Sequence, residues 1–403
     1  MNQLFIDKAF SKLLALVASL TLLTFYVSDA TAQEIDGSLV SLLEKDWAVP
    51  SVFAGDCSSV VECGDVCDQQ VLTKNACPKR DEVVCISARD DVWFVNARQS
   101  HLCPENVSQI QCYRLRNGVW ESSSLTALTQ DHASDKSRVT FVYAHGNRTD
   151  EGWAKSRGLQ VYKTVFRPTE PTVEVCVRPA LRYVIFAWKS EQEKLRLLPD
   201  YTVKSRRSPV VGQSFGRFLS QFEDRKMVLC GFSLGAQVIL AGLSDSELDA
   251  AEIGSANLNR YKVALLAPAL DPDFVWNCLP QIQHNMLIER TEVFVSLTDR
   301  AIKLAEKLAS KTPRAWVAVF QELGQSSHDS ANPVSLFDVT EDAGKRHLTE
   351  SYASSSCVIS RLNKMVAEVQ HFMGSSRDNA DGSDRVESQT PAPSAGNLEA
   401  VEE

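Results

Sequence analysis

From about residue 138 onward, strand-length apolar runs alternate with segments whose apolar residues recur at helical spacing. Runs that are apolar at nearly every position are typical of strands covered on both faces. Six of them are predicted strands, beginning at residues 138 (RVTFVYAHGN), 182 (RYVIFAWKS), 226 (KMVLC), 261 (YKVALLAPALD), 291 (TEVFVSLTD) and 334 (VSLFDVT). Between them, one helical face is marked by Val211, Phe215, Phe218, Leu219 and Phe222. The alternation predicts an α/β fold, a mostly parallel sheet with helices on both faces, closed by an amphipathic helix over 357–372.

The region before this pattern is different, because it is short, rich in cysteine and carries two strand-like stretches. In DDVWFVNARQ, which begins at residue 90, Val92, Phe94 and Asn96 face one way and Trp93 and Val95 the other. IQCYRLRNGVW, from residue 110, is the second stretch. These strands form either a separate small β module or additions to the edge of the following sheet.

The predicted organisation follows from these patterns. Residues 33–125 form a Cys-rich N-terminal region, and residues 126–373 form the α/β domain. The last 30 residues, 374–403, are rich in Ser, Pro, Asp and Glu and have no apolar face to bury, so they are a predicted disordered acidic tail.

The first 32 residues have the features of an export signal. Lys8 and Lys12 precede a mostly apolar stretch, Leu13–Val27, and small residues for cleavage follow at Ala30–Ala32. We therefore expect a signal peptide over 1–32 and a periplasmic or extracellular mature protein without a stable membrane span. An uncleaved membrane anchor is the alternative, but the apolar run is short for a span.

Cysteine usage agrees with an oxidising compartment. Of eleven cysteines, seven crowd into one segment: Cys57, Cys63, Cys67, Cys77, Cys85, Cys103 and Cys112. About three disulfides are predicted there, rather than a zinc site, because the segment has no CxxC pair. Since seven is odd, one cysteine is expected to pair outside the cluster, with Cys176 as the candidate. Cys230, between core residues, is predicted to be a buried free thiol.

The charge of the chain limits the classes of partner that it can bind. The formal net charge is -9, and no basic stretch of the kind that binds nucleic acid occurs. The composition, 44% hydrophobic, indicates a globular protein with a sizeable core. No metal or organic cofactor is expected.

The stretch KMVLCGFSLGAQVILAGL places Ser233 between Gly231 and Gly235, at the junction of a predicted strand and a predicted helix. G-x-S-x-G in this context is the pattern of a nucleophile elbow, a turn too sharp for neighbours that carry a β-carbon. An ordinary glycine-rich turn is the alternative. In an elbow, the N–H of Leu234 is one oxyanion donor, and the loop at Ala144–Asn147 supplies the other, the N–H of Asn147.

A serine nucleophile needs a base, and the base needs an orienting acid, in the chain order Ser, acid, His. Asp299 follows a predicted strand, and Asp271 is its competitor one strand earlier. For the base, His347 lies in a loop before the last helix, with His328 as the competitor.

Three further groups are set aside. His284 precedes Asp299 and breaks the order, His371 lies inside the last helix, and Asp273 is expected near a helix N-terminus. His145 is expected to order its loop rather than carry protons.

The segments VTFVYAHGN, GFSLGA, VALLAPALD, VSLTDRAI and HLTESY, in this order, resemble an exported bacterial alpha/beta hydrolase family of unknown function that is esterase- or lipase-like. The resemblance covers Arg138 to about Leu362. It implies an alpha/beta-hydrolase fold with Asn147, Ser233, Asp299 and His347 in the site. In this chain HGN stands where the family has a bulkier aromatic after HG, and Tyr352 follows His347 at a longer spacing.

The expected function is that of an exported serine hydrolase cleaving a small ester or lipid-like acyl substrate through a Ser-His-Asp triad. Two alternatives stay open. A non-catalytic envelope protein could use the hydrolase fold as a binding scaffold. A peptidase or thioesterase would share the chemistry and differ in substrate. The oligomeric state is not indicated by the sequence.

Overall fold

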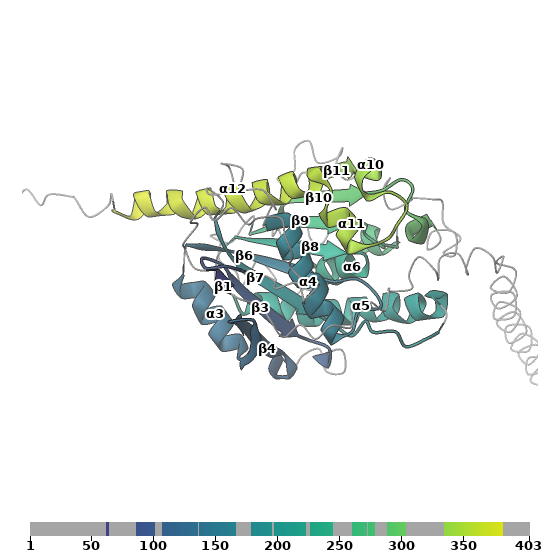
Figure 1. The fold of residues 1–403 in the computed structure, drawn as a ribbon, viewed down its shortest axis with the longest axis horizontal. Helices are drawn as coiled ribbons and strands as arrows, with labels where there is room; N and C mark the ends of the chain where they lie inside the picture. The colour runs from purple at the N-terminus through teal and green to yellow at the C-terminus, as the bar shows by residue number, and fades with distance from the viewer. Residues whose placement is uncertain are drawn as a thin grey trace, which may run out of the picture.

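A nine-stranded sheet forms the centre of the molecule (Figure 1). The structure is a computed structural model. It describes residues 62–63, 86–100, 107–135, 137–166, 179–195, 197–222, 226–244, 260–271, 273–278, 288–303 and 334–381. The predicted signal peptide, His284 and His328 lie outside these residues.

The strands follow the apolar runs closely, with ends that differ by a few residues. Their bounds are β1 Glu62–Cys63, β2 Ile86–Ser87, β3 Asp91–Asn96, β4 Gln111–Arg116, β5 Val119–Ser123, β6 Arg138–Ala144, β7 Ala180–Ala187, β8 Met227–Phe232, β9 Tyr261–Leu266, β10 Ile288–Val295 and β11 Val334–Asp338. The main helices are α3 Leu125–Ser134, α4 Glu151–Phe166, α5 Leu197–Ser220, α6 Leu234–Leu243, α10 Thr340–Ala343, α11 Thr349–Ala353 and α12 Ser356–Asp381.

The sheet order is β11-β10-β9-β8-β6-β7-β3-β4-β5, and β1 and β2 form a separate two-stranded pair. From β11 to β3 all neighbours are parallel, whereas β4 and β5 add antiparallel strands at one edge. The carboxyl ends of the parallel strands therefore meet at a single edge, where an α/β sheet collects its functional loops. The mostly parallel sheet with helices confirms the predicted fold class.

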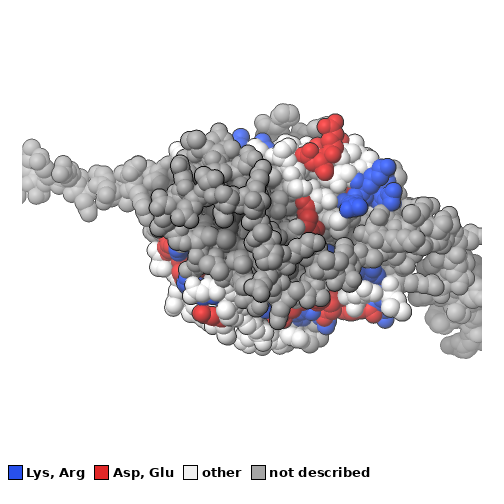
Figure 2. Space-filling view, viewed as in Figure 1, with Lys and Arg blue, Asp and Glu red and all other residues white. Residues whose placement is uncertain are grey.

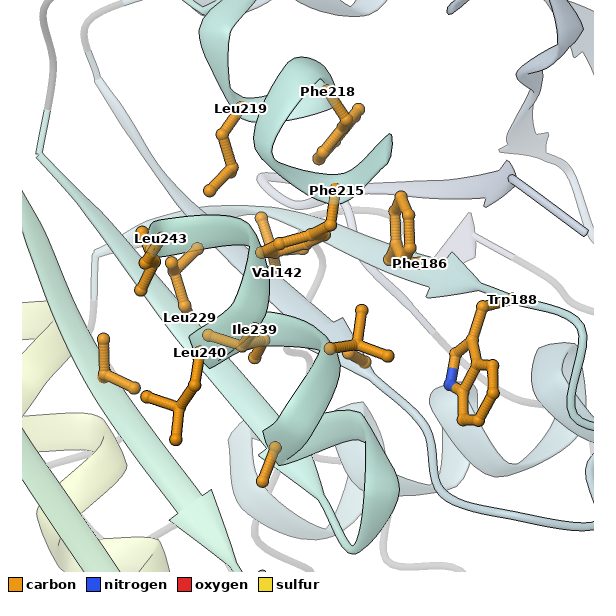
Figure 3. Packing of buried hydrophobic residues seen from close by; sticks show 14 of the residues in the cluster. Val142, Phe186, Trp188, Phe215, Phe218, Leu219, Leu229, Ile239, Leu240 and Leu243 are labelled. Carbon is orange, nitrogen blue, oxygen red and sulfur yellow. The ribbon is translucent and has the colours of Figure 1, made fainter. Parts of the chain in front are cut away.

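Helices cover both faces and give two hydrophobic layers. One layer packs α3, α5 and α6 on the sheet, and the other packs α4, α10, α11 and α12. Figure 3 shows part of the first layer, where Phe215 and Phe218 of α5 meet Phe186 of β7, with ring centroids 4.8 and 5.4 Å apart. Of the predicted helical face, Val211, Phe215, Phe218 and Leu219 lie on this buried face of α5, and Phe222 is buried just after the helix ends.

Strands β3, β4 and β5 of the N-terminal region belong to the main sheet rather than to a separate module. β3 pairs in parallel with β7, and its two faces join the two layers: Val92 and Phe94 in one, Trp93 and Val95 in the other. A boundary at residue 125 therefore does not separate two independently packed units. The reason is that β3 is buried on both faces and needs both helical layers to cover it.

Two further expectations are corrected or limited. Helix α12 continues to Asp381, so the segment expected to be disordered from residue 374 begins inside a helix. Among the cysteines with described side chains, Cys112, Cys230, Cys278 and Cys357 are free thiols, and burial raises the pKa of Cys112 to about 12. Cys230 is thus confirmed as a buried free thiol. The other cysteines fall outside the described side chains, and disulfides among them stay a prediction.

The described surface carries both signs of charge. Figure 2 shows acidic and basic side chains next to one another at the end of the molecule that carries α10 and α11. In the part of the chain that the structure describes, no helix is both long enough and apolar enough to cross a membrane.

Candidate active site

Ser233 lies on a strained turn between β8 and α6. Its backbone has φ 54° and ψ -121°, a region that non-glycine residues rarely adopt. The flanking glycines permit the turn. A Cβ on Gly235 would lie 2.2 Å from the carbonyl oxygen of Ala144, and one on Gly231 would lie 2.7 Å from the backbone of Ala236. This strand-turn-helix geometry is that of a nucleophile elbow.

The structure brings Ser233, His347 and Asp299 into one hydrogen-bonded chain. Ser233 Oγ lies 2.8 Å from His347 Nε2, and His347 Nδ1 lies 2.7 Å from Asp299 Oδ2. Because a carboxylate only accepts hydrogen bonds, Asp299 fixes the proton on Nδ1 and leaves Nε2 to accept from the serine hydroxyl. The three side chains come from loops after β8, after β10 and after α10. All three residues are buried.

The carboxylate of Asp299 is itself held from several sides. Its Oδ1 accepts from the N–H groups of Ala301 and Ile302 at 3.0 and 3.2 Å. Tyr352 donates its hydroxyl to Oδ2 at 2.8 Å and accepts the N–H of Ser296 at 3.2 Å. Burial by itself raises the pKa of Asp299, but the charge of protonated His347 and these hydrogen bonds outweigh it and lower the pKa. Asp299 is therefore kept as the anion that orients His347.

The hydrogen bond from Tyr352 to Asp299 was not predicted from the sequence. In the sequence, Tyr352 stood out only as the tyrosine that follows the histidine in the family pattern. The one local signal is its place in α11, five residues after His347, but the spacing does not say that its hydroxyl turns toward Asp299.

The competing residues are elsewhere or outside the described chain. The Asp271 carboxylate accepts the N–H of Asp273 at 2.8 Å, at the start of the helical segment 273–278, and makes no contact with His347. His371 is exposed on α12. His328 lies outside the described residues, so its position relative to Ser233 is not compared with that of His347.

The loop after β6 lies against the serine. A Cβ on Gly146 would come within 3.0 Å of Ser233 Cβ, which shows how closely the two segments approach. Among the described residues, the N–H groups of Leu234 and Asn147 have no hydrogen-bond acceptor. Leu234 opens helix α6, where the free N–H groups and the helix dipole favour negative charge. The two N–H groups predicted to bind the oxyanion thus lack an acceptor among the described residues, and their role stays a prediction.

His145 has a structural arrangement. Its Nδ1 lies 2.9 Å from the carbonyl oxygen of Gly146, its Nε2 accepts the N–H of Trp188 at 3.3 Å, and its ring stacks on Trp188. Burial lowers the pKa of His145 to about 4, so the ring is neutral at pH 7. These contacts agree with the expectation that His145 orders the loop.

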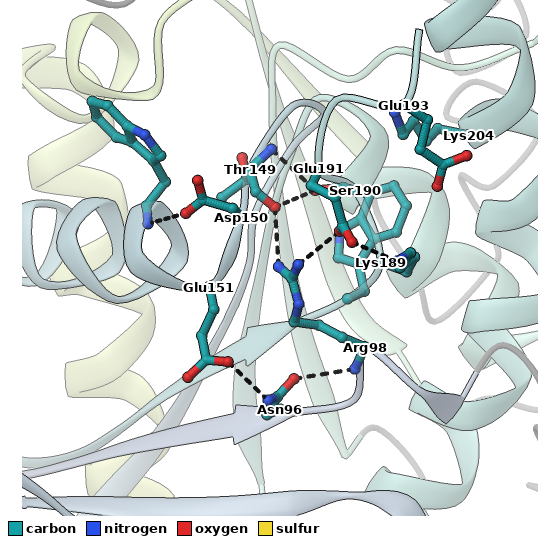
Figure 4. Close-up of polar contacts among 12 residues, drawn as sticks. Asn96, Arg98, Thr149, Asp150, Glu151, Lys189, Ser190, Glu191, Glu193 and Lys204 are labelled. Atoms are coloured by element: carbon teal, nitrogen blue, oxygen red, sulfur yellow. Dashed lines mark hydrogen bonds and ion pairs between the residues drawn. The ribbon is translucent and has the colours of Figure 1, made fainter. Parts of the chain in front are cut away.

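A polar network fixes the rest of this loop (Figure 4). Thr149 and Ser190 pair backbone to backbone at 3.2 Å, and the Ser190 hydroxyl donates to Thr149 O at 3.1 Å. Arg98, paired with Glu191 at 2.8 Å, also donates to Thr149 O at 3.4 Å.

A second anchor is the buried carboxylate of Asp200. It accepts from Arg148 Nε at 3.2 Å, from Lys204 Nζ and from the N–H groups of Glu193 and Lys194. Although burial raises the pKa of Asp200, these hydrogen bonds and the Lys204 charge lower it overall. Helix α5 is thereby tied to the residue that follows Asn147, and the loop is held in place before any substrate binds.

Within the described residues, no group of three or more His, Cys, Asp or Glu side chains is placed to hold a metal ion.

A parallel sheet with an elbow serine at its carboxyl edge and helices on both faces defines an alpha/beta hydrolase. Residues 129–368 match the family described as "Alpha/beta hydrolase of unknown function" (DUF900). This match covers more than half of the 403 residues, and the chain belongs to that family. A search among curated proteins finds no match.

Proposed function

We propose that this protein is a serine hydrolase that cleaves an ester or a related acyl substrate. The observation that carries the proposal is the hydrogen-bonded chain Ser233–His347–Asp299 on a strained elbow. The N–H groups of Leu234 and Asn147, which have no acceptor among the described residues, support it. Membership of an alpha/beta hydrolase family supports the hydrolase class, while the substrate and the roles of these residues are our proposal.

The proposed chemistry has two half-reactions, acylation of Ser233 and hydrolysis of the acyl-serine. Ser233 Oγ attacks the acyl carbon while His347 Nε2 takes its proton, and the oxyanion binds to the N–H groups of Leu234 and Asn147. His347 then donates the proton to the leaving alcohol, which departs and leaves an acyl-serine. Water attacks this ester with His347 again as base, releasing the acid and restoring Ser233. Asp299 stabilises the imidazolium throughout and holds its tautomer.

A fluorophosphonate probe combined with a panel of p-nitrophenyl esters tests the proposal. We expect labelling at Ser233 and ester turnover, and a drop in kcat of about 10⁴-fold or more in Ser233→Ala and in His347→Ala, because the members act as a unit. The double variant is expected to be little worse than either single one.

Asp299→Asn and its matched control, Asp271→Asn, test which aspartate orients His347. The first is expected to lower kcat far more than the second, since Asp299 contacts His347 and Asp271 contacts the N–H of Asp273. Labelling that persists in Ser233→Ala would show that another residue is the nucleophile. Folded wild-type protein that neither reacts with the probe nor turns over esters would favour a non-catalytic scaffold.

We also propose that the mature protein is exported and begins at Gln33, because Ala30–Ala32 follows the apolar run Leu13–Val27. N-terminal sequencing of the exported protein tests this, and a chain that retains Met1 would favour a membrane anchor.

A further inference from the structure

The side chain of Asn147 is an unexplained polar group in the loop after β6. The residue is only 4% exposed, and neither its Oδ1 nor its Nδ2 has a hydrogen-bond partner. A buried polar group without a partner costs about 1–3 kcal/mol, so such groups call for a reason.

The neighbours of Asn147 make the contrast clear. His145 is bonded on both ring nitrogens, Arg148 is bonded to Asp200, and Thr149 is bonded to Ser190. The Asn147 carbonyl accepts the Thr149 hydroxyl at 3.1 Å, which helps to fix its backbone. Among the described residues of this loop, the side chains of His145, Arg148 and Thr149 therefore have partners, whereas the carboxamide of Asn147 has none.

The backbone N–H and the carboxamide of Asn147 belong to a residue that lies next to the serine turn in space. The preceding residue, Gly146, is in close contact with Ser233, and consecutive Cα atoms are about 3.8 Å apart. If the backbone N–H binds the carbonyl oxygen of an acyl substrate, the carboxamide branches from the same residue. On this assumption, the substrate atoms one or two bonds beyond that carbonyl are the ones nearest to the carboxamide.

The available chemistry is that of a neutral group that both donates and accepts. A carboxamide offers N–H donors and a carbonyl acceptor side by side, and a hydroxyl can use both at once. The two arginines that contact this loop among the described residues are already paired with carboxylates, Arg148 with Asp200 and Arg98 with Glu191. A neutral hydroxyl therefore fits this position better than a carboxylate.

We propose that the Asn147 carboxamide binds a neutral hydroxyl placed one or two carbons from the ester group of the substrate. This inference rests on the proposed hydrolase function and adds the substrate class. The hydroxyl could belong to the acyl part, as in a 2-hydroxy acid ester, or to the alcohol part, as in a glycol ester. Both sources present the same group to Asn147.

Two hydroxyl/methyl pairs of esters distinguish these sources. Methyl 2-hydroxybutanoate is compared with methyl 2-methylbutanoate, and 2-hydroxyethyl butanoate with propyl butanoate. In wild type, kcat/KM for the hydroxyl ester of one pair should exceed that for its methyl partner. In Asn147→Leu, which keeps the backbone N–H and removes the carboxamide, this preference should fall by about 10- to 100-fold. The pair that responds identifies the source.

Tyr183→Phe is the matched control, because the Tyr183 hydroxyl is equally buried and unpartnered but lies in the core of β7. It should leave the preference unchanged. If Asn147→Leu does not fold, as judged by circular dichroism, Asn147→Ala replaces it.

Two results would overturn the proposal. One is an Asn147→Leu protein that slows all four esters equally, which would mean that the carboxamide serves the oxyanion or the loop. The other is a preference that the substitution does not change.

If wild type hydrolyses none of the esters and Ser233 is not labelled, it is the proposed function that fails. Binding then decides the inference, through the shift in melting temperature with each unhydrolysed ester. A shift with a hydroxyl ester that its methyl partner lacks, and that is lost in Asn147→Leu, supports the carboxamide site. Equal shifts, or none, overturn it.

Discussion

At the residue scale, His145 connects the pH dependence of stability to the position of the loop after β6. Its ring is buried and neutral, bonded to Gly146 and Trp188. Protonation would place a charge in a buried site and would remove the acceptor for the Trp188 N–H.

Replacing His145 with Gln should flatten the pH dependence of stability. The pKa of His145 in the folded protein is about 4, below the ordinary value of 6.5. Between these values the unfolded chain binds a proton that the folded chain does not, so the free energy of unfolding falls as the pH drops. The contribution is about 3 kcal/mol across the window.

Urea denaturation of wild type and His145→Gln at pH 7 and pH 4.5 measures this difference. The variant is expected to be less stable at pH 7, because hydrogen bonds are lost, but to lose less stability on acidification. Equal losses in the two proteins would mean that His145 is protonated in the folded state.

At the element scale, the close contact between the start of α6 and the end of β6 sets the geometry of the site. The contact brings the loop that carries Asn147 close to the turn that carries Ser233 and Leu234. It is made without a side chain at Gly235, so that backbone meets backbone.

Gly235→Ala should therefore destabilise the protein by more than about 2 kcal/mol. The added Cβ would lie 2.2 Å from Ala144 O and 2.6 Å from His145 O, and these backbone atoms cannot move without shifting β6. Gly152→Ala in α4 is the control, since its nearest neighbour would be 3.5 Å away. That control should be neutral or stabilising by up to about 1 kcal/mol. Thermal unfolding measures both, and equal melting temperatures would refute the close contact.

At the scale of the whole molecule, the strands β3 to β5 complete the sheet although the family match begins only at residue 129. Trp93 and Phe94 are fully buried on opposite faces of β3, so both layers depend on this strand. Without it, β7 becomes an exposed apolar edge.

A protein that begins at residue 126 should be insoluble or unfolded. In contrast, a protein that ends at Asp381 should keep its melting temperature within about 2 °C, because the residues removed, 382–403, are polar and acidic with no apolar face. Circular dichroism and thermal unfolding of the two truncated proteins measure this. A soluble, cooperatively unfolding protein from residue 126 would show that β3 to β5 are dispensable. A loss of several degrees on removing 382–403 would mean that the tail packs on the domain.

The sequence alone determined the elements and the elbow, because both are local. Strand-length apolar runs and helical spacing are properties of neighbouring residues, and Gly231 and Gly235 are required within two residues of Ser233. The pattern analysis still left α4 unremarked, and it placed the start of the tail inside α12.

Only the tertiary structure decided which distant groups meet. His347 contacts residues 114 and 48 positions away, Ser233 and Asp299, and spacing along the chain carries no information about such pairs. For the same reason, the sequence left Asp271 open beside Asp299, did not show that Tyr352 reaches the carboxylate, and did not decide whether β3 joined the main sheet. That the Asn147 carboxamide has no hydrogen-bond partner is also a tertiary property, because it depends on the bonds that the neighbouring groups make.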